Sequence, residues 1–305
     1  MLLAQTLRNS NVALTLGPSP LGEGSKARLC LTLERIILTK VPPKSSTKVL
    51  VTFVGHVGTI TLNNADKHNA FDDVLIAEIS AAIQECNRSM STRVIVLAAA
   101  GKSFSAGADL NWMQRIADYT QEENEEDAMA LAALMGALHG TRKPTIARVQ
   151  GAAFGGGVGL VACCDMAVGT VNASFCLSET KLGLVPAVIS PYVIAAIGER
   201  AAHRYFLTAE KFSAAEAHRI GLLHEVVTDE AALDAKIAEM AAALCLAGPK
   251  AIEEAKKLIA LVAHQPIDET LQSETAEFIA RIRGSREGRE GVTAFLEKRK
   301  PSWLE

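Results

Sequence analysis

The sequence predicts an α/β protein with a mostly parallel sheet and a helical C-terminal third. Short apolar runs of strand length alternate with segments of helical periodicity over residues 49–185. Glycine-dense turns follow two of these runs, and strand signals fade after Pro186. Strands and helices that alternate at these lengths are typical of right-handed βαβ units, in which neighbouring strands run parallel.

The predicted strands lie in the first half of the chain. Residues 49–54 and 57–62 are rich in Val, Ile and Thr and flank a Gly-His pair, which indicates two strands joined by a turn. A helix is expected from Asp72 to about Arg88, because apolar residues recur there at helical spacing. The pattern then predicts strands at 94–98, 144–149 and 165–171, helical sequence after the glycine-bearing loop 101–107 through His139, and a small-residue helix at 158–164.

The region beyond Pro186 is expected to be helical. Its periodic segments are 187–200, 201–209, 214–220, 230–245, 249–263, 269–283 and 290–298. The chain is therefore expected to consist of a core domain over residues 48–245 and a helical C-terminal region over 246–305.

Residues 1–47 differ from the rest of the chain. They contain four prolines and scattered basic residues, and they show no sustained periodicity. This pattern predicts a poorly ordered N-terminal extension. It is read either as a dispensable tail of a cytoplasmic protein or as a transit peptide, which would place the protein in the mitochondrial matrix.

Composition excludes several classes of function. With 305 residues and 49% hydrophobic content, the chain can bury a large core, and its net charge of -3 argues against a nucleic-acid partner. No apolar run reaches the ~18 residues that a membrane helix needs. The six cysteines form no C-x-x-C pair or Cys/His cluster, which indicates reduced thiols and no metal site.

The first candidate site is the segment GKSFSAGADL at 101–110. It follows a predicted strand, and Asp109 is placed to cap the next helix. Its small residues allow backbone N–H groups to face an anion or oxyanion. An ordinary structural turn is the alternative interpretation.

The second candidate site is the segment GAAFGGGVGL at 151–160. Three successive glycines open a helix, where N–H groups are free and the helix dipole favours negative charge. The segment lacks the Gly-Lys-Ser/Thr ending of a phosphate loop and the position of a dinucleotide motif. Close helix–strand packing through glycine is the alternative.

The third candidate is Glu179 in the segment FCLSETKLGLVP at 175–186. Apolar and small neighbours favour a desolvated carboxyl group with a raised pKa, which suits a proton shuttle. The alternative is a solvated loop carboxylate beside Lys181.

These segments occur together and in order, and the combination resembles the crotonase (enoyl-CoA hydratase/isomerase) superfamily over roughly Val49 to Leu304. The blocks KPTIARVQGAAFGGGVGL, CDMAV, GLLHEVV and the closing AFLEKRKPSW contribute to the resemblance. It implies a ββα-repeat spiral core and a helical C-terminal trimerisation region. It also implies an acyl-CoA thioester substrate, no separate cofactor because coenzyme A is part of the substrate, and a homotrimer or dimer of trimers.

The resemblance also implies roles for individual residues. The N–H groups of Ala108 and Gly156 would form the oxyanion hole, and Glu179 would move the proton. Gly159 stands where two-glutamate hydratases have their other acid. The implied CoA-binding residues are Lys67, His68, Ala70, Ala106, Phe295 and Lys298, and the expected substrate-pocket residues are Trp112, Met113, Ile116 and Pro186.

The expected reaction is the hydration of an α,β-unsaturated acyl-CoA. Among family members, the sequence most resembles bacterial hydratases of 3-methylglutaconyl-CoA and related branched glutaconyl-CoA substrates, as in leucine degradation. Arg115, Arg148 and Lys181 are candidates to meet the second carboxylate of such a substrate. Gly159 keeps a Δ3,Δ2-enoyl-CoA isomerase open as an alternative, and a non-catalytic crotonase-fold binding protein is a further one.

Overall fold

The computed structural model describes residues 47–304, so all but the last residue of the predicted extension 1–47 lies outside the described residues. The strands in the described range form two sheets. The six-stranded sheet has the order β1 (Val49–Val54), β2 (Val57–Leu62), β3 (Val94–Ala99), β5 (Thr145–Val149), β7 (Met166–Thr170) and β10 (Glu225–Val227). The four-stranded sheet has the order β4 (Ser103–Ala106), β6 (Ala152–Phe154), β8 (Ser174–Cys176) and β9 (Phe212–Ser213). Pairing is parallel except between β1 and β2 and between β8 and β9.

The helices connect and cover these sheets. They are α2 (Asp73–Arg88), α3 (Leu110–Ile116), α4 (Gln121–His139), α5 (Gly156–Cys163), α6 (Ser190–Thr208), α7 (Ala214–Arg219), α8 (Glu230–Leu246), α9 (Pro249–Val262), α10 (Glu269–Gly284) and α11 (Arg286–Leu296), with short 3-10 turns η1 (Ala65–Lys67), η2 (Glu179–Leu182) and η3 (Ser302–Leu304). A strand of the large sheet, a strand of the small sheet and a helix follow one another in β3-β4-α3, β5-β6-α5 and β7-β8-η2-α6. This order confirms the predicted α/β class and its ββα repeat.

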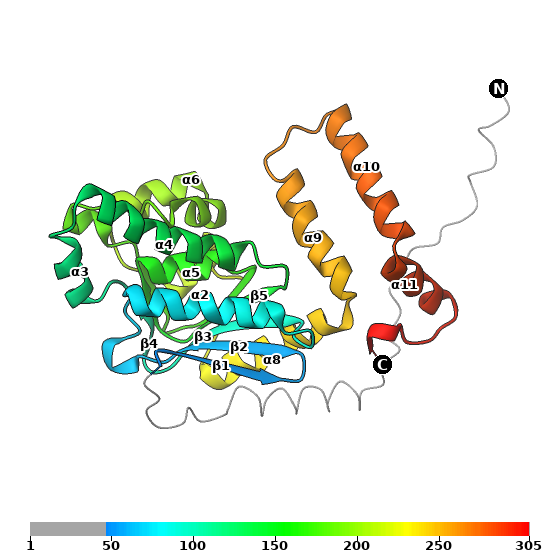
Figure 1. Cartoon of the computed structure of the whole chain (residues 1–305), viewed down its shortest axis with the longest axis horizontal. Helices are drawn as coiled ribbons and strands as arrows, with labels where there is room; N and C mark the ends of the chain where they lie inside the picture. Colours follow the sequence, from blue (N-terminus) through cyan, green and yellow to red (C-terminus); the bar gives the residue numbers. More distant parts are fainter. Residues whose placement is uncertain (1–46, 305) are drawn as a thin grey trace.

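Helices cover both faces of the large sheet. Figure 1 shows α2, α4, α5 and α6 stacked on one face and α8 on the other. All six residues of β3 are buried, which explains its uninterrupted apolar run. None of the helices within residues 47–304 is long and apolar enough to cross a membrane.

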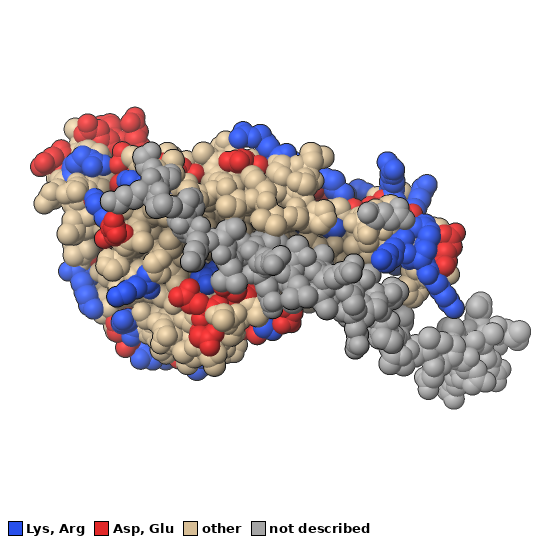
Figure 2. Space-filling model, turned by 90° about the horizontal axis from the view of Figure 1, so that it is seen from below, with Lys and Arg blue, Asp and Glu red and all other residues tan. Residues whose placement is uncertain are grey.

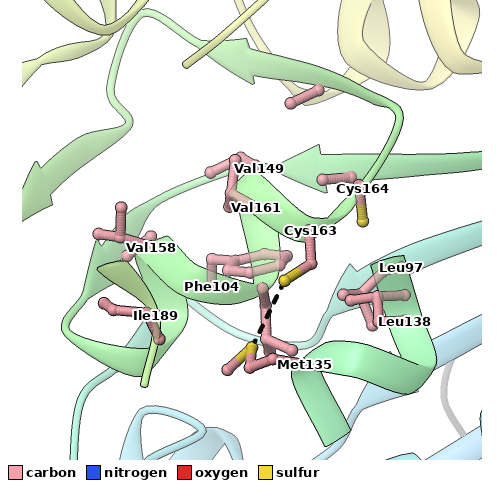
Figure 3. Packing of buried hydrophobic residues seen from close by; sticks show 14 of the residues in the cluster. Leu97, Phe104, Met135, Leu138, Val149, Val158, Val161, Cys163, Cys164 and Ile189 are labelled. Atoms are coloured by element: carbon pink, nitrogen blue, oxygen red, sulfur yellow. Dashed lines mark hydrogen bonds between the residues drawn. The ribbon is translucent and has the colours of Figure 1, made fainter. Parts of the chain in front are cut away.

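The larger of two apolar clusters surrounds α5. Figure 3 shows Val158, Val161 and Cys163 of this helix packed among Leu97 and Phe104 and near Met135 and Ile189. The five cysteines that the structure describes are free thiols, and four of them are buried. The helix that opens with the candidate oxyanion donor Gly156 is therefore held on several sides by the core.

The C-terminal helices α9, α10 and α11 extend to the side of the core, as Figure 1 shows. The Trp303 indole N–H donates to the Leu246 carbonyl at 3.2 Å, and Lys256 of α9 pairs with Asp165 at 2.7 Å. In Figure 2, Lys and Arg side chains gather at the end of the molecule formed by these helices, with acidic side chains among them. This region is thus joined to the core by a small number of polar contacts.

The small sheet was not predicted from the sequence. Its strands are two to four residues long, too short for an alternation to be recognised, and β4 and β6 lie inside segments interpreted as glycine turns. The predicted helices 187–200 and 201–209 form α6, in which Gly198 has φ +74 and interrupts the helical backbone. The expectation that strands end near Pro186 was wrong, because β9 and β10 each add a short strand beyond it.

Asp234→Ala is expected to destabilise the fold by about 3–5 kcal/mol, because it leaves a buried guanidinium without its main partner. Arg148 of β5 is buried, and its Nε donates to the Asp234 carboxylate of α8 at 2.6 Å. Urea unfolding measures the effect. Lys236→Ala on the same helix is the matched control, since its pairs with Glu225 and Glu239 lie at the surface and should contribute less than about 1 kcal/mol. Equal losses in the two variants would contradict the prediction.

Candidate active site

Gly107 and Ala108 follow the end of β4, beside an extended segment at Phe71. The Phe71 N–H donates to the Gly107 carbonyl at 2.7 Å, and the Asp109 N–H donates to the Phe71 carbonyl at 2.7 Å. Successive N–H groups of an extended chain point in opposite directions, so the Ala108 N–H points away from Phe71. It donates no hydrogen bond to any residue that the structure describes. This N–H is therefore available to a ligand.

Gly155 and Gly156 follow the end of β6, the neighbouring strand. The Gly155 N–H donates to the Cys176 carbonyl at 2.9 Å, and its φ of +49 turns the chain sharply into α5. Gly156 is the first residue of α5, so its N–H has no acceptor within the helix and lies at the positive end of the helix dipole. It is a second available donor.

The two glycine turns lie against each other. A Cβ atom on Gly156 would come within 3.1 Å of the Phe71 ring, and one on Gly155 would lie 4.0 Å from the Gly107 Cα. The cause is the pairing of Ala106 with Phe154, which places the ends of β4 and β6 side by side. The structure therefore brings Ala108 and Gly156 to one edge of the small sheet.

Glu179 reaches the same place from β8, the next strand. A Cβ atom on Gly155 would lie 3.1 Å from the Glu179 Oε1, and the Oε2 is buried without a hydrogen-bond partner among the described residues. Burial raises the pKa of this carboxyl above its ordinary value, while a hydrogen bond from its own backbone lowers it by less. The Lys181 ammonium donates instead to the Ala209 carbonyl at 2.7 Å. A desolvated carboxyl group thus lies beside two free N–H donors.

Comparison with known proteins identifies the family of the chain. The chain matches the family model "Enoyl-CoA hydratase/isomerase" over residues 52–305. The chain belongs to the enoyl-CoA hydratase/isomerase family. It is similar to the crystal structure of an enoyl-CoA hydratase from Shewanella pealeana, with 46% identity, a TM-score of 0.82 and coverage of 84% of this chain and 96% of that one. It is also similar to AtuE of Pseudomonas aeruginosa, with 33% identity, a TM-score of 0.79 and coverage of 85% and 100%.

The family assignment confirms several predictions from the sequence. The protein has the crotonase fold and is an enzyme of this family, and the family implies an acyl-CoA substrate. An enzyme of this family is not the non-catalytic binding protein that the sequence left open as an alternative. Within residues 47–304, no group of three His, Cys, Asp or Glu side chains could hold a metal ion.

Four of the residues expected to bind CoA lie beside the turn at Ala108. Lys67 and His68 belong to the η1 turn, Ala70 is buried, and the Ala106 N–H donates to the His68 carbonyl at 3.0 Å. The Lys67 ammonium pairs with the Asp109 carboxylate at 2.7 Å and, through this hydrogen bond, lowers the pKa of Asp109. The η1 turn and the turn at Ala108 are therefore joined.

Phe295 and Lys298 are not near this site within one chain. Phe295 lies at the end of α11 with 75% of its side chain exposed, and Lys298 follows it. Figure 1 shows α11 at the opposite end of the molecule from α3. Any contact of these residues with CoA would have to involve the site of another subunit.

The expected substrate-pocket residues lie around α3 and the segment before α6. Trp112 and Pro186 are buried, whereas Met113 and Ile116 are half-buried. The Trp112 indole N–H donates to the Asp127 carboxylate at 3.0 Å and joins α3 to α4. Asp127 lies in α4, and nothing in the local sequence around it indicates this contact.

The basic residues considered for a second substrate carboxylate already have partners. Arg148 is bound to Asp234 and Glu230, Arg115 to Asp73 at 2.6 Å, and Lys181 to a backbone carbonyl. Arg148 is also buried against α8, on the far face of the large sheet from α5. The structure therefore offers none of the three as an unpaired cation for the substrate.

Asn69 is a supporting residue that sequence reasoning missed. It is completely buried and has φ +54, and its side-chain amide donates to the carbonyls of Ala100 and Ser103 at 2.9 and 3.0 Å. Its Oδ1 accepts the Asn64 N–H at 2.8 Å, and its carbonyl accepts the Ser105 hydroxyl at 2.8 Å. Asn is among the few residues that tolerate positive φ, which is the signal that could have identified it.

Asn69→Ala should destabilise the protein by about 2–4 kcal/mol and lower kcat, because it leaves buried polar groups unpaired beside the turn at Ala108. Asn69→Gly separates the loss of the hydrogen bonds from the strain of a positive φ, since glycine adopts a positive φ without strain but restores no hydrogen bond. Thermal unfolding and steady-state kinetics provide the measurements. Wild-type stability in Asn69→Gly would show that the hydrogen bonds contribute little.

Proposed function

We propose that the protein hydrates an α,β-unsaturated acyl-CoA thioester and uses Glu179 as its single catalytic carboxyl group. The proposed substrate is 3-methylglutaconyl-CoA or a related branched glutaconyl-CoA. The observation that carries this proposal is the convergence of the Ala108 N–H, the Gly156 N–H and the half-buried Glu179 carboxyl at one sheet edge.

The two N–H groups would bind the thioester oxygen. When water adds to the β-carbon, the electrons of the double bond move toward the thioester and place negative charge on this oxygen. Donors that face a developing oxyanion typically contribute ~3–4 kcal/mol each to transition-state stabilisation. The dipole of α5 adds to the attraction, since Gly156 stands at its first turn.

One carboxyl group is sufficient for the proton transfers. In its ionised form Glu179 takes a proton from water while the oxygen of that water bonds to the β-carbon. The protonated carboxyl then delivers this proton to the α-carbon as the enolate collapses. A pKa raised by burial suits a group that must be both acceptor and donor. With Gly159 in place of a second acid, backbone groups and the second carboxylate of the substrate would help to hold the water.

The branched glutaconyl substrate is supported by sequence resemblance. The blocks GGGVGL, SETKLGLVPAVISPYV and AHRYFLTAEKFSAAEAHRIGL are similar to those of bacterial hydratases for such substrates. A Δ3,Δ2-enoyl-CoA isomerase is the second candidate, and the apolar side chains of Ile189 and Met135 next to Gly159 favour it. One base can carry a proton between two carbons without any bound water.

We also propose a homotrimer or a dimer of trimers, assembled through the C-terminal helices. These helices expose apolar side chains that a monomer would leave in water. They are Ile259, Ile279, Val292, Phe295 and Leu296. Assembly would cover this surface and bring Phe295 and Lys298 to the CoA of a neighbouring subunit.

The substrate is tested with a panel of enoyl-CoA thioesters and analysis of the products. We expect 3-methylglutaconyl-CoA to give 3-hydroxy-3-methylglutaryl-CoA faster than straight-chain 2-enoyl-CoA gives its 3-hydroxy product. Isomerisation of a 3-enoyl-CoA without any hydration product would reject the hydratase in favour of the isomerase.

Glu179→Gln should lower kcat at least ~100-fold, because the amide cannot exchange a proton with the substrate. Its shape is nearly that of the acid, so KM should change little. Steady-state kinetics on the purified variant is the measurement, with circular dichroism to verify folding. Near-normal turnover would exclude Glu179 as the acid/base.

The pH dependence of kcat/KM should follow the ionisation of Glu179. Because the ionised form takes the proton from water, kcat/KM should rise with pH through a pKa above the ordinary 4.5 of a glutamate.

A raised pKa of Glu179 in the folded state also means that the protonated form stabilises folding, and this contribution is lost as pH rises through that pKa. Glu179→Gln should therefore have a Tm equal to or above that of the wild type at neutral pH. A lower Tm would contradict the burial argument.

A further inference from the structure

Gly159 lies in a space already filled by other side chains. It is three residues after Gly156 in α5, so both glycines lie on one side of the helix. A Cβ atom on Gly159 would overlap the Ile189 Cγ2, lie 2.9 Å from the Ile189 Cβ and lie 3.2 Å from the Met135 Cε. Even an alanine at this position would therefore require Ile189 to move.

Ile189 is held firmly in this place. Its side chain is 2% exposed, and Figure 3 shows it beside α5 within the apolar cluster. It is the N-cap residue of α6, where its carbonyl accepts the Val193 N–H at 3.0 Å. Ile189 follows the η2 turn that carries Glu179, so both residues lie in the segment that connects β8 to α6.

Met135 closes the same space from α4. It is completely buried, and its sulfur lies 3.7 Å from the Cys163 sulfur at the end of α5. Ile189 and Met135 therefore meet over Gly159 from two different helical segments, one helical turn from the oxyanion donor Gly156. An acyl group whose carbonyl oxygen is bound at Gly156 would begin about 4.5 Å along the helix axis from this wall.

We propose that Ile189 determines the specificity of the site: with Met135 it forms an apolar wall over Gly159 that limits the acyl group and leaves no room for a second acidic side chain at this position. This inference rests on the proposed function. It goes further because it explains the presence of only one acidic side chain in the site by Gly159 and Ile189 together, and not by the glycine alone. The wall limits substrates by shape, and the absence of a second carboxylate follows from the same packing.

A double-mutant cycle of stability tests the packing without any assay of activity. Gly159→Ala should lower Tm by about 3–10 °C through overpacking. Ile189→Gly should lower Tm by leaving a cavity, although glycine is acceptable at an N-cap. The loss of Tm in the double variant should be smaller than the sum of the two single losses, because the new methyl group enters the vacated space. Additive losses would overturn the proposed contact.

Substrate preference tests the role in specificity. Ile189→Ala should raise the kcat/KM ratio of long or bulky to short enoyl-CoA at least ~10-fold, since even one methylene in an apolar pocket changes selectivity by that factor. Ile83→Ala is the matched control, because Ile83 is equally buried but lies in α2. It should lower stability and leave the ratio unchanged. An unchanged ratio in Ile189→Ala, or an equal change in both variants, would overturn the proposal.

A second acid should become tolerable only after Ile189 is removed. Gly159→Glu alone should be unstable, whereas Gly159→Glu with Ile189→Gly should recover Tm and raise the ratio of hydration to isomerisation above that of Ile189→Gly. A Tm for the double variant no higher than for Gly159→Glu would reject the packing argument. If wild-type protein converted no enoyl-CoA of the panel, the proposed function would fail, while the stability cycle would still decide the contact.

Discussion

The parallel pairing of β4, β6 and β8 is the constraint on which the site depends. Each of these strands is only three or four residues long, yet their registers place Ala106 beside Phe154 and Phe154 beside Cys176. Because the carboxyl ends of parallel strands meet at one edge, the turns that follow them are brought together. Ala108, Gly156 and Glu179 each come from a different one of these turns. A shift of one residue in either pairing would separate the donors from the acid.

The chemistry of the site also depends on the close approach of glycine backbones. Gly155 leaves room for the Glu179 carboxyl, and Gly156 leaves room for the Phe71 ring. Glu179 is half-buried in this packing, and its buried Oε2 has no hydrogen-bond partner among the described residues. An unpartnered carboxyl oxygen in an apolar setting lowers the stability of the folded state. The same desolvation raises the pKa of this carboxyl above its ordinary value, which suits a group that both accepts and donates a proton.

Support for the site comes from residues that are not themselves placed at the reacting atoms. Asn69 joins the η1 turn to the start of β4, and Asp109 both caps α3 and binds Lys67. On the other side, Trp112 joins α3 to α4 through Asp127. Buried polar networks of this kind rigidify a site when all their members are satisfied. The turn at Ala108 is therefore held both from the η1 turn and from α3.

The sequence by itself determined the fold class, the main helices and strands, and the three segments that carry the site. Local sequence patterns indicate those features: apolar periodicity, glycine at helix starts and a glutamate among apolar residues. The small sheet, the convergence at its edge, and the supporting contacts of Asn69 and Asp127 were decided only by the tertiary structure. Strands of two to four residues have too few positions for a period, and contacts between residues 15 or 31 positions apart leave no local signal. Gly159 shows the same division, since the sequence indicates which side chain is missing there and only packing shows that Ile189 fills its place.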